Sequence, residues 1–277
     1  MNEQYRLSDG YAIPKVGFGT YRLKGSDGVR RIEQALNVGY RLIDSAFNYE
    51  NEGTVGKAIR QSHVARDQIT YTSKLPGRHY AYADAVSTIE ESLLRSGLDY
   101  IDLYLLHWPN PKAGRYVEAW QALIDAQRWG LVRSIGVCNF LPEHIDRLEK
   151  ETGVLPVVNQ IELHPRFNQA AQRQYNAEKQ IITQAWSPLN RAGAVLDEPV
   201  LHAIAAAHQR SLAQIILRWE LQLGVLPIPK SSHISRQQSN FALFDFNLSE
   251  EEMAQINQLT RVDGRQKGQD PAVYEEF

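Results

Sequence analysis

The sequence predicts an α/β fold of the (β/α)8 (TIM) barrel type, and three observations support this. Short runs of β-branched residues alternate with amphipathic segments along almost all 277 residues, which is typical of parallel strands joined by helical crossovers. The chain also has the length of about 250 residues that eight such units require. Finally, the first run leads into GFGTYRLKG, which lacks the G-x-G-x-x-G turn by which an open doubly wound sheet is usually identified.

Eight segments qualify as strands of this barrel because each is a short apolar run bounded by turn-forming residues. The predicted strands are residues 15–19, 41–44, 69–74, 101–107, 132–137, 157–162, 181–186 and 225–229.

Most of the segments between these strands have the spacing of amphipathic helices. Between the third and fourth strands, Val86, Ile89, Leu93 and Leu94 are predicted to share one buried face, and Gly97 supplies a helix stop.

Three segments lie outside the eight units. Asp9 and Gly10 stand between two alternating runs, which predicts a β-hairpin covering the bottom of the barrel. Two further helices are predicted at residues 197–208 and 249–259, the second starting with a capping box of Ser249 and Glu252. No linker or low-complexity segment interrupts the pattern, so we expect one domain over residues 1–277.

The composition narrows the classes of function. With a net charge of −2, the chain carries no field that would attract nucleic acid or an anionic membrane. No window has the roughly 18 apolar residues of a membrane span, and the N-terminus shows no secretory signal. The single cysteine, Cys138, excludes an internal disulfide and fits a reducing compartment. We therefore expect a cytoplasmic protein, and nothing in the sequence requires more than a monomer.

Four chemically capable side chains follow neighbouring strands. Asp44 ends the second predicted strand with Tyr49 in the loop behind it, Lys74 ends the third, and His107 ends the fourth. Because TIM-barrel active sites form at the C-terminal ends of the strands, we expect the four to meet.

An acid, a phenol, an ammonium and an imidazole at one place suggest carbonyl chemistry. Lys74 would pair with Asp44 and lower the pKa of Tyr49 from about 10, which makes the phenol a usable proton donor. His107 would polarise a carbonyl oxygen. No Ser-His-Asp or Cys-His arrangement offers a protein nucleophile, so the attacking species should be a hydride from a cofactor.

The segment after the eighth strand indicates which cofactor. Lys230, Ser231, Ser232 and Arg236 lie where TIM barrels often bind phosphate, and two cations fit a dinucleotide with an additional 2′-phosphate. Trp186 offers a flat face to a nicotinamide ring. The amides of Asn139, Asn159 and Gln160 could bind its carboxamide.

With these residues assembled, the chain resembles the aldo-keto reductase superfamily over nearly its whole length. GYRLIDSAFNYENEGTVG, residues 39–56, resembles the family's motif around its catalytic aspartate and tyrosine. YLLHWP resembles the histidine strand, LVRSIGVCNF the carboxamide-binding segment, and IPKSSHISRQQSN the phosphate-binding motif. The branch that it most resembles contains the bacterial 2,5-diketogluconate and glyoxal reductases.

The resemblance implies NADPH-dependent reduction of aldehydes or ketones, reactive dicarbonyls among them, to alcohols. The implied catalytic residues are Asp44, Tyr49, Lys74 and His107, with Tyr49 as the proton donor. The implied cofactor-binding residues are Gly19, Thr20, Cys138, Asn139, Gln160, Trp186, Ser187, Leu189, Lys230, Ser231, Ser232, Arg236 and Asn240. The implied substrate-binding residues are Tyr21, Phe47, His107 and Trp108.

This chain departs from the family's pattern at several positions. Cys138 replaces the commoner serine, which predicts modestly weaker cofactor binding because a thiol is a weaker hydrogen-bond partner. Ser239 replaces a common glutamate near the adenine, and Tyr21 stands where many relatives have tryptophan. The tail after Leu259 is short, which predicts an open, permissive pocket.

Two other functions compete with this interpretation. A metal-dependent barrel hydrolase or isomerase could use Asp44, His107, Glu162 and His164 as ligands, but it would leave the cations at 230–236 unexplained. A regulatory barrel could retain the nucleotide site without useful turnover, but the intact tetrad argues against it.

Overall fold

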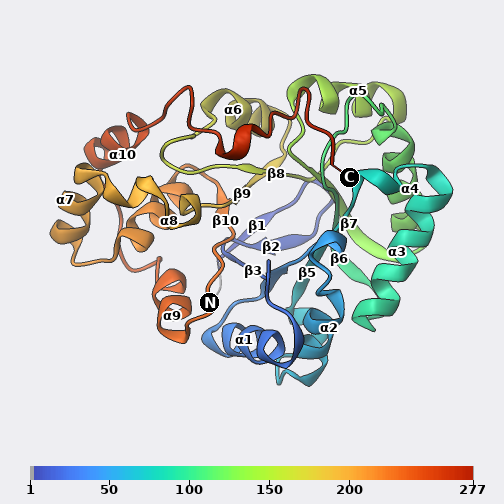
Figure 1. The fold of residues 1–277 in the computed structure, drawn as a ribbon, viewed down its shortest axis with the longest axis horizontal. Coiled ribbons are helices and arrows are strands. Elements are labelled where there is room, and N and C mark those ends of the chain that lie inside the picture. The colour runs from blue at the N-terminus through green and yellow to red at the C-terminus, as the bar shows by residue number, and fades with distance from the viewer. Residues whose placement is uncertain (1–2, 277) are drawn as a thin grey trace.

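The computed structural model, which describes residues 3–276, is an eight-stranded parallel barrel surrounded by helices (Figure 1). The strand order β10-β9-β8-β7-β6-β5-β4-β3 follows the chain, and Gly19 N donates to Pro229 O at 3.0 Å, which joins the first barrel strand to the last. The barrel strands are β3 (Gly17–Gly19), β4 (Leu42–Asp44), β5 (Thr70–Leu75), β6 (Ile101–Leu106), β7 (Val132–Cys138), β8 (Val158–Glu162), β9 (Ile182–Trp186) and β10 (Leu226–Pro227).

All eight predicted strands are confirmed, although most are slightly shorter than predicted. The largest differences are at the two edges, where β3 and β10 cover only part of 15–19 and 225–229. In the last strand, Pro227 and Pro229 have no backbone N–H to donate, which limits regular pairing there.

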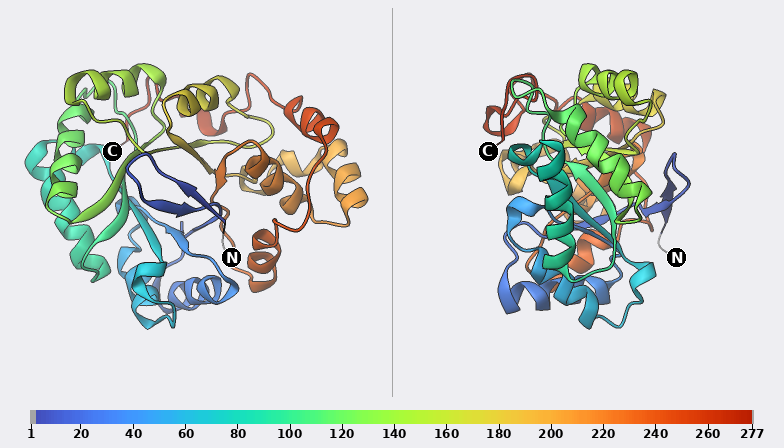
Figure 2. Two further views of the ribbon diagram at one scale, coloured as in Figure 1. Left: turned by 180° about the vertical axis from the view of Figure 1, so that it is seen from behind. Right: turned by 90° about the vertical axis from the view of Figure 1, so that its right-hand side faces the viewer.

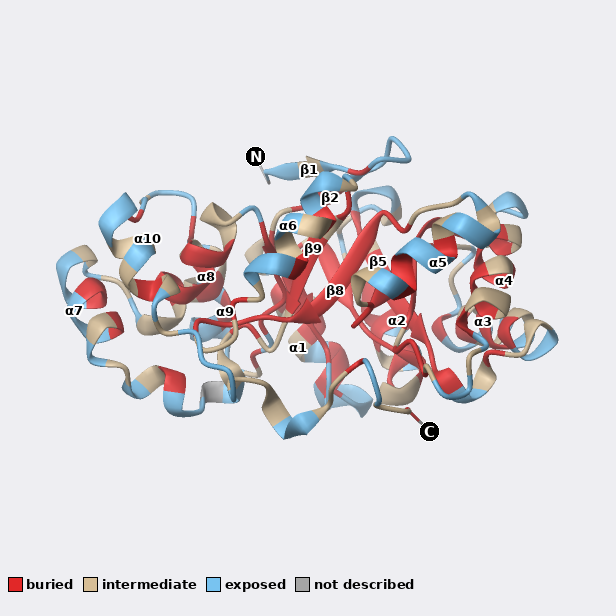
Figure 3. Cartoon of the chain, turned by 90° about the horizontal axis from the view of Figure 1, so that it is seen from above, coloured by how far each residue is buried: buried red, intermediate tan, exposed pale blue. Residues whose placement is uncertain are grey.

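Helices cover the outside of the barrel and present apolar faces to it (Figure 3). The helices between successive strands and after β10 are α1 (Gly25–Val38), α2 (Glu52–Gln61), α3 (Tyr82–Ser96), α4 (Tyr116–Arg128), α5 (Pro142–Thr152), α6 (Ala170–Glu178), α8 (Leu212–Gln222) and α9 (Ile234–Phe241). In α3, Ile89 is buried, but Leu94 is 77% exposed, so its predicted place on the buried face is wrong. Leu94 lies about 100° around the helix from Leu93 and therefore faces solvent.

The three predicted additions are also present. The strands β1 (Gln4–Arg6) and β2 (Ala12–Pro14) pair antiparallel as the hairpin. Helix α7 (Pro199–His208) is inserted after β9, and α10 (Glu250–Asn257) follows α9 with the predicted capping box of Ser249 and Glu252.

The hairpin and the C-terminal tail lie at opposite ends of the barrel (Figure 2). Leu7 and Ile13 of the hairpin segment are buried in the same cluster as the barrel residues Leu42 and Leu103, and Ser134 Oγ donates to Asp9 Oδ2 at 2.6 Å. The hairpin therefore closes the end of the barrel where the strands begin. The tail lies at the other end, beside the loops that follow the strands.

Side chains fill the barrel interior and leave no room for substitution at some positions. A Cβ atom on Gly136 would lie 2.7 Å from Leu105 Cδ2 and 2.8 Å from Val158 O. The barrel body is thus a packed core, and chemistry is confined to its ends. Within the described chain, no helix has both the length and the apolar character needed to cross a bilayer.

Candidate active site

Three neighbouring strands bring the four predicted catalytic residues together. Asp44 ends β4, Lys74 is next to the last residue of β5, and His107 follows β6 directly. Tyr49 lies in the 3-10 turn Phe47–Tyr49 behind β4. Because β4, β5 and β6 are adjacent and parallel, their ends meet at the same rim of the barrel.

Lys74 and Asp44 form a buried ion pair. The Lys74 ammonium lies 2.8 Å from each carboxylate oxygen of Asp44 and donates to Ser45 O at 2.6 Å, so its three protons have three acceptors. Burial lowers the pKa of Lys74, but the carboxylate of Asp44 outweighs burial and the net pKa is raised above the ordinary value. Gln160 Nε2 donates to Asp44 Oδ2 at 2.9 Å, which holds the acid from the other side.

Tyr49 lies against this ion pair. The Lys74 Nζ is 5.0 Å from the centre of the Tyr49 ring, and the ring centres of Tyr21 and His107 are 5.0 Å and 6.1 Å away. Burial raises the pKa of Tyr49 to about 12, although Lys74 lowers it in part. The predicted direction of the Lys74 effect is confirmed, but the expected net lowering is wrong because desolvation of the phenolate is the larger effect.

His107 meets a residue that the sequence did not point to. Its Nδ1 lies 2.7 Å from Oε1 of Glu276, an approach too oblique for a well-formed hydrogen bond. On the opposite side, Asn139 Nδ2 donates to the backbone oxygen of His107 at 3.0 Å. The imidazole therefore sits between the end of β7 and the C-terminal tail.

The residues predicted to hold a nicotinamide ring lie at the ends of β7, β8 and β9. Asn139 has the left-handed φ of 61°, and its Oδ1 accepts a 2.7 Å hydrogen bond from Trp186 Nε1, so the indole is fixed in orientation. Ser187 also has a left-handed φ, of 52°, where the chain turns out of β9. Cys138 is 1% exposed at the end of β7, and Leu189 packs on the apolar core.

A group of cations lies where β10 ends, on the far side of β3 from Tyr49. Burial lowers the pKa of Lys230, and the neighbouring positive charges of Arg31 and Arg22 lower it further. No carboxylate within residues 3–276 forms an ion pair with Arg22, Lys230 or Arg236. Positive charge without acidic partners is what a phosphate group would neutralise.

The other predicted cofactor residues lie near the cations around Lys230 or near the ion pair of Lys74 and Asp44. Ser231 and Asn240 are buried, Ser232 accepts a hydrogen bond from Arg31 through its backbone oxygen, and Arg236 is exposed on the first turn of α9. Near the ion pair, Thr20 Oγ1 donates to Asp44 O at 2.8 Å. Gly19 precedes Thr20 at the end of β3.

Of the predicted substrate residues, the structure brings three close to Tyr49 or its neighbours. Tyr21 is 44% exposed beside Tyr49, His107 lies on the other side, and Trp108 follows His107. Phe47 differs, because its ring packs against Arg95 and His79, with the Arg95 guanidinium 3.9 Å from the ring centre.

The openness of the pocket stays a prediction, although the tail covers part of the site. Trp108 is buried, and its ring centre lies 4.5 Å from that of Tyr274 in the tail. The chain after α10 extends across the loops after β5 and β6, and Glu276 contacts His107.

The structure does not assemble the alternative metal site. Glu162 and His164 lie together, with 3.0 Å between His164 Nε2 and Glu162 Oε1, but Asp44 is paired with Lys74 and His107 with Glu276. Among the residues described, no group of three or more His, Cys, Asp or Glu side chains could hold a metal ion.

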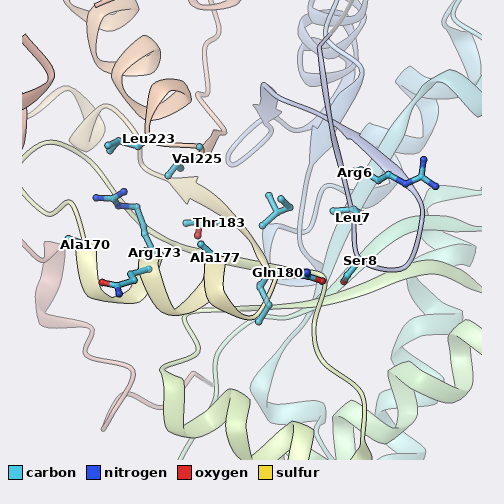
Figure 4. Close-up of a pocket in the computed structure, with 14 residues that line it drawn as sticks. Arg6, Leu7, Ser8, Ala170, Arg173, Ala177, Gln180, Thr183, Leu223 and Val225 are labelled. Atoms are coloured by element: carbon cyan, nitrogen blue, oxygen red, sulfur yellow. The ribbon is translucent and has the colours of Figure 1, made fainter. Parts of the chain in front are cut away.

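A separate cavity of about 590 Å3 opens near the hairpin, at the end of the barrel away from the tetrad (Figure 4). Its lining includes Arg6, Ser8, Arg173, Thr183 and Val225. The strands begin at this end, where barrel enzymes rarely place their chemistry.

Sequence reasoning missed three residues of the site. Arg22 and Arg31 join the cation group at Lys230, and Glu276 joins His107. Arg22 directly follows Tyr21 in the loop after β3, so its place at the rim could have been noticed. No sequence pattern marks Arg31 or Glu276.

The chain is similar to known proteins over nearly its whole length. The model of the Aldo/keto reductase family matches residues 15–261. The chain is 47% identical to 2,5-diketo-D-gluconic acid reductase B of Corynebacterium sp., over 98% of this chain and 97% of that protein. It is 43% identical to methylglyoxal reductase DkgA of Salmonella typhimurium, over 96% of each. A crystal structure of a Gox0644 mutant in complex with NADPH has a TM-score of 0.94 and 38% identity, covering 99% of both chains.

Proposed function

The chain belongs to the aldo/keto reductase family, and on this premise we propose that it reduces reactive dicarbonyls and small aldehydes with Tyr49 as the proton donor. The general activity, NADPH-dependent reduction of a carbonyl group, follows from the family and from relatives solved with NADPH. The observation that carries the assignment of residues is the buried pair of Lys74 and Asp44, with the ammonium 5.0 Å from the centre of the Tyr49 ring.

The proposed reaction balances as a two-electron reduction. When bound, NADPH would supply the hydride, that is, the two electrons of the reduction. Tyr49 gives its phenolic proton to the carbonyl oxygen, so an alcohol is formed and a phenolate remains. The pKa of about 12 keeps the phenol protonated at neutral pH, and the ammonium of Lys74 stabilises the phenolate as it forms.

His107 has the proposed role of orienting the substrate. Its ring is close to Tyr49 and is held between Asn139 and the tail, so a carbonyl oxygen between the two rings could accept from both. Tyr21 and Trp108 would form the walls around the remainder of the substrate. Phe47 would contribute less than the sequence suggests, because its ring is covered by Arg95 and His79.

The residues present fit NADPH at both ends. Trp186, fixed by its bond to Asn139, would stack on the nicotinamide, and Cys138, Asn139 and Gln160 would face the carboxamide. At the other end, the cations without acidic partners would neutralise phosphate. Ser187 and Leu189 would line the path of the pyrophosphate, with Gly19 and Thr20 beside it. The 2′-phosphate and adenine would contact Lys230, Ser231, Ser232, Arg236 and Asn240, joined by Arg22 and Arg31.

We further propose that the protein acts as a monomer in the cytoplasm. Its one thiol, Cys138, is buried, and the barrel holds all the proposed catalytic groups within one chain. Light scattering of the purified protein at micromolar concentration should give the mass of a single chain.

The test is to follow NADPH absorbance with the purified protein and methylglyoxal, phenylglyoxal, a nitrobenzaldehyde, an aldose and a diketogluconate. We expect turnover with the dicarbonyls and the aromatic aldehyde and formation of one alcohol per NADPH consumed. Tight NADPH binding without turnover of any compound would favour a regulatory barrel and contradict the proposal.

A further inference from the structure

The last residues of the described chain are fixed in place over the rim of the barrel. The Asn110 side chain pairs with the backbone of Glu276, donating from Nδ2 to Glu276 O at 2.8 Å and accepting from Glu276 N at Oδ1 at 3.0 Å. Lys112 N donates to Glu275 Oε1 at 2.6 Å, and Tyr274 packs on Trp108. These contacts from three consecutive tail residues give the Glu276 side chain a defined position.

That side chain turns inward and is held by three groups. Glu276 is 7% exposed. Its Oε1 lies 2.8 Å from Asn48 Nδ2 and 2.7 Å from His107 Nδ1, and its Oε2 accepts from Gly77 N at 3.1 Å. The carboxylate therefore lies beside His107, the proposed orienting residue, and contacts Asn48, the residue before Tyr49.

The contacts of the carboxylate favour its charged form. Burial raises the pKa of Glu276, but the contacts with His107, Gly77 and Asn48 outweigh it and leave the pKa below the ordinary value. Asp44, which also lies at this rim, is neutralised by Lys74 at 2.8 Å. Glu276 therefore places negative charge at the substrate end of the site.

This position has a direct consequence for substrates. A carboxylate next to a carbonyl held by His107 would be repelled by the negative charge of Glu276, which lies 2.7 Å from the same imidazole. The amide of Asn48 and the N–H of Gly77, which could bind a substrate carboxylate, are already used by Glu276. An anionic substrate would therefore bind more weakly because of this repulsion, or would bind only when the tail is displaced.

We propose that Glu276 is a specificity-determining residue that favours uncharged carbonyl substrates over those with a carboxylate beside the carbonyl. This rests on the proposed function and narrows its substrate class to neutral dicarbonyls, keto esters and aldehydes.

The test compares one ketone in two charge states, methyl benzoylformate and benzoylformate. The wild type should reduce the ester with the higher kcat/KM. Glu276→Gln, which keeps the size and removes the charge, should raise kcat/KM for benzoylformate relative to that for the ester by at least about tenfold. The ratio of the two values is the readout, because a merely structural role would change both substrates alike.

Two further variants keep the test decisive. Glu275→Gln changes the neighbouring acid, which contacts Lys112 N outside the pocket, and should leave the ratio unchanged. Asn110→Ala removes the tail's anchor but retains the charge, and should also reduce the preference for the ester as the tail is released.

The outcomes separate this proposal from the proposed function. One outcome is that Glu276→Gln leaves the ratio of the two kcat/KM values as it is in the wild type, including when both substrates are slowed equally. In that case Glu276 does not determine specificity even though the enzyme reduces carbonyls. If the wild type oxidises NADPH with neither the ester nor methylglyoxal, the proposed function itself is wrong and this proposal fails with it.

Discussion

The ammonium nitrogen of Lys74 lies 2.8 Å from both carboxylate oxygens of Asp44, and both side chains are almost completely buried. Isolated burial of either charge would be costly, whereas the pair together satisfies both. The arrangement holds a fixed positive charge 5.0 Å from the centre of the Tyr49 ring. It links the stability of the barrel to the proposed chemistry.

Breaking this ion pair should therefore lower both the stability of the fold and the rate of carbonyl reduction. Asp44→Ala should lower the free energy of unfolding by about 3–5 kcal/mol, because it leaves a buried ammonium without its partner. Carbonyl reduction should fall with it, since Lys74 loses its orientation. Urea denaturation and NADPH oxidation measure the two effects. Glu151→Ala, which breaks an exposed ion pair with Arg147 on α5, is the control and should change neither, and equal effects of the two variants would contradict the account.

Arg236 should discriminate between the two nicotinamide dinucleotides. Arg236→Ala removes a guanidinium that is free to bind a 2′-phosphate, a contact worth roughly 1.5–3 kcal/mol or about 10–100-fold in affinity. The Kd for NADPH, measured by tryptophan fluorescence, should rise by that factor and the Kd for NADH should change little. Arg128→Ala, at the distant end of α4, is the matched control. Equal losses for NADPH and NADH would exclude the 2′-phosphate contact.

The phenol of Tyr49 should titrate only in strongly alkaline solution. Its pKa is raised to about 12 by burial, so in the free enzyme it keeps its proton from neutral pH to beyond pH 10. Because the folded pKa exceeds the unfolded value of about 10, its contribution to stability is complete below pH 10 and is lost as pH rises through 12. Tyrosinate absorbance at pH 10–11 should be the same in the wild type and in Tyr49→Phe. Additional tyrosinate in the wild type at that pH would show that Lys74 dominates.

Glu220 of α8 should also make the protein less stable as the pH rises. Neither of its carboxylate oxygens has a hydrogen-bond partner within the described chain, and burial raises the pKa of Glu220 well above its ordinary value. The folded state therefore holds a proton that the unfolded chain releases above about pH 4.3, so the wild type loses stability as pH rises toward the folded pKa.

Replacing Glu220 by glutamine should remove that pH dependence. The Tm of Glu220→Gln relative to the wild type should be higher at pH 8 than at pH 5 by roughly 2–4 °C, the shift that about 1 kcal/mol gives in a chain of this size. The same substitution at the exposed Glu178 should show no pH-dependent difference. A constant Tm difference between pH 5 and pH 8 would mean that Glu220 finds a partner.

The barrel and the meeting of Asp44, Tyr49, Lys74 and His107 could be predicted from sequence because both depend on chain order. Alternating strand and helix patterns define the units, and parallel strands place their C-terminal ends at one rim. The left-handed φ of Asn139 and the bond from Trp186 to it were beyond such reasoning, since they depend on the exact path of loops.

The quantities that could not be predicted depend on burial and on distant contacts. The net pKa of Tyr49 is a balance between desolvation and Lys74, and sequence gives only the second. Leu94 has the spacing of a buried residue but faces outward, because apolar spacing does not fix the edge of a helix's buried face. The contact of Glu276 with His107 joins residues far apart in the chain, and the tail has no periodicity that would reveal it.

The most direct test of the central claim is the effect of Tyr49→Phe on binding and turnover, measured on the same preparation. The substitution removes the phenolic oxygen and keeps the ring, so the Kd for NADPH should stay within about twofold. Reduction of methylglyoxal should fall by at least about 100-fold, the lower range for loss of a general acid. Unchanged NADPH binding with turnover close to that of the wild type would contradict Tyr49 as the proton donor.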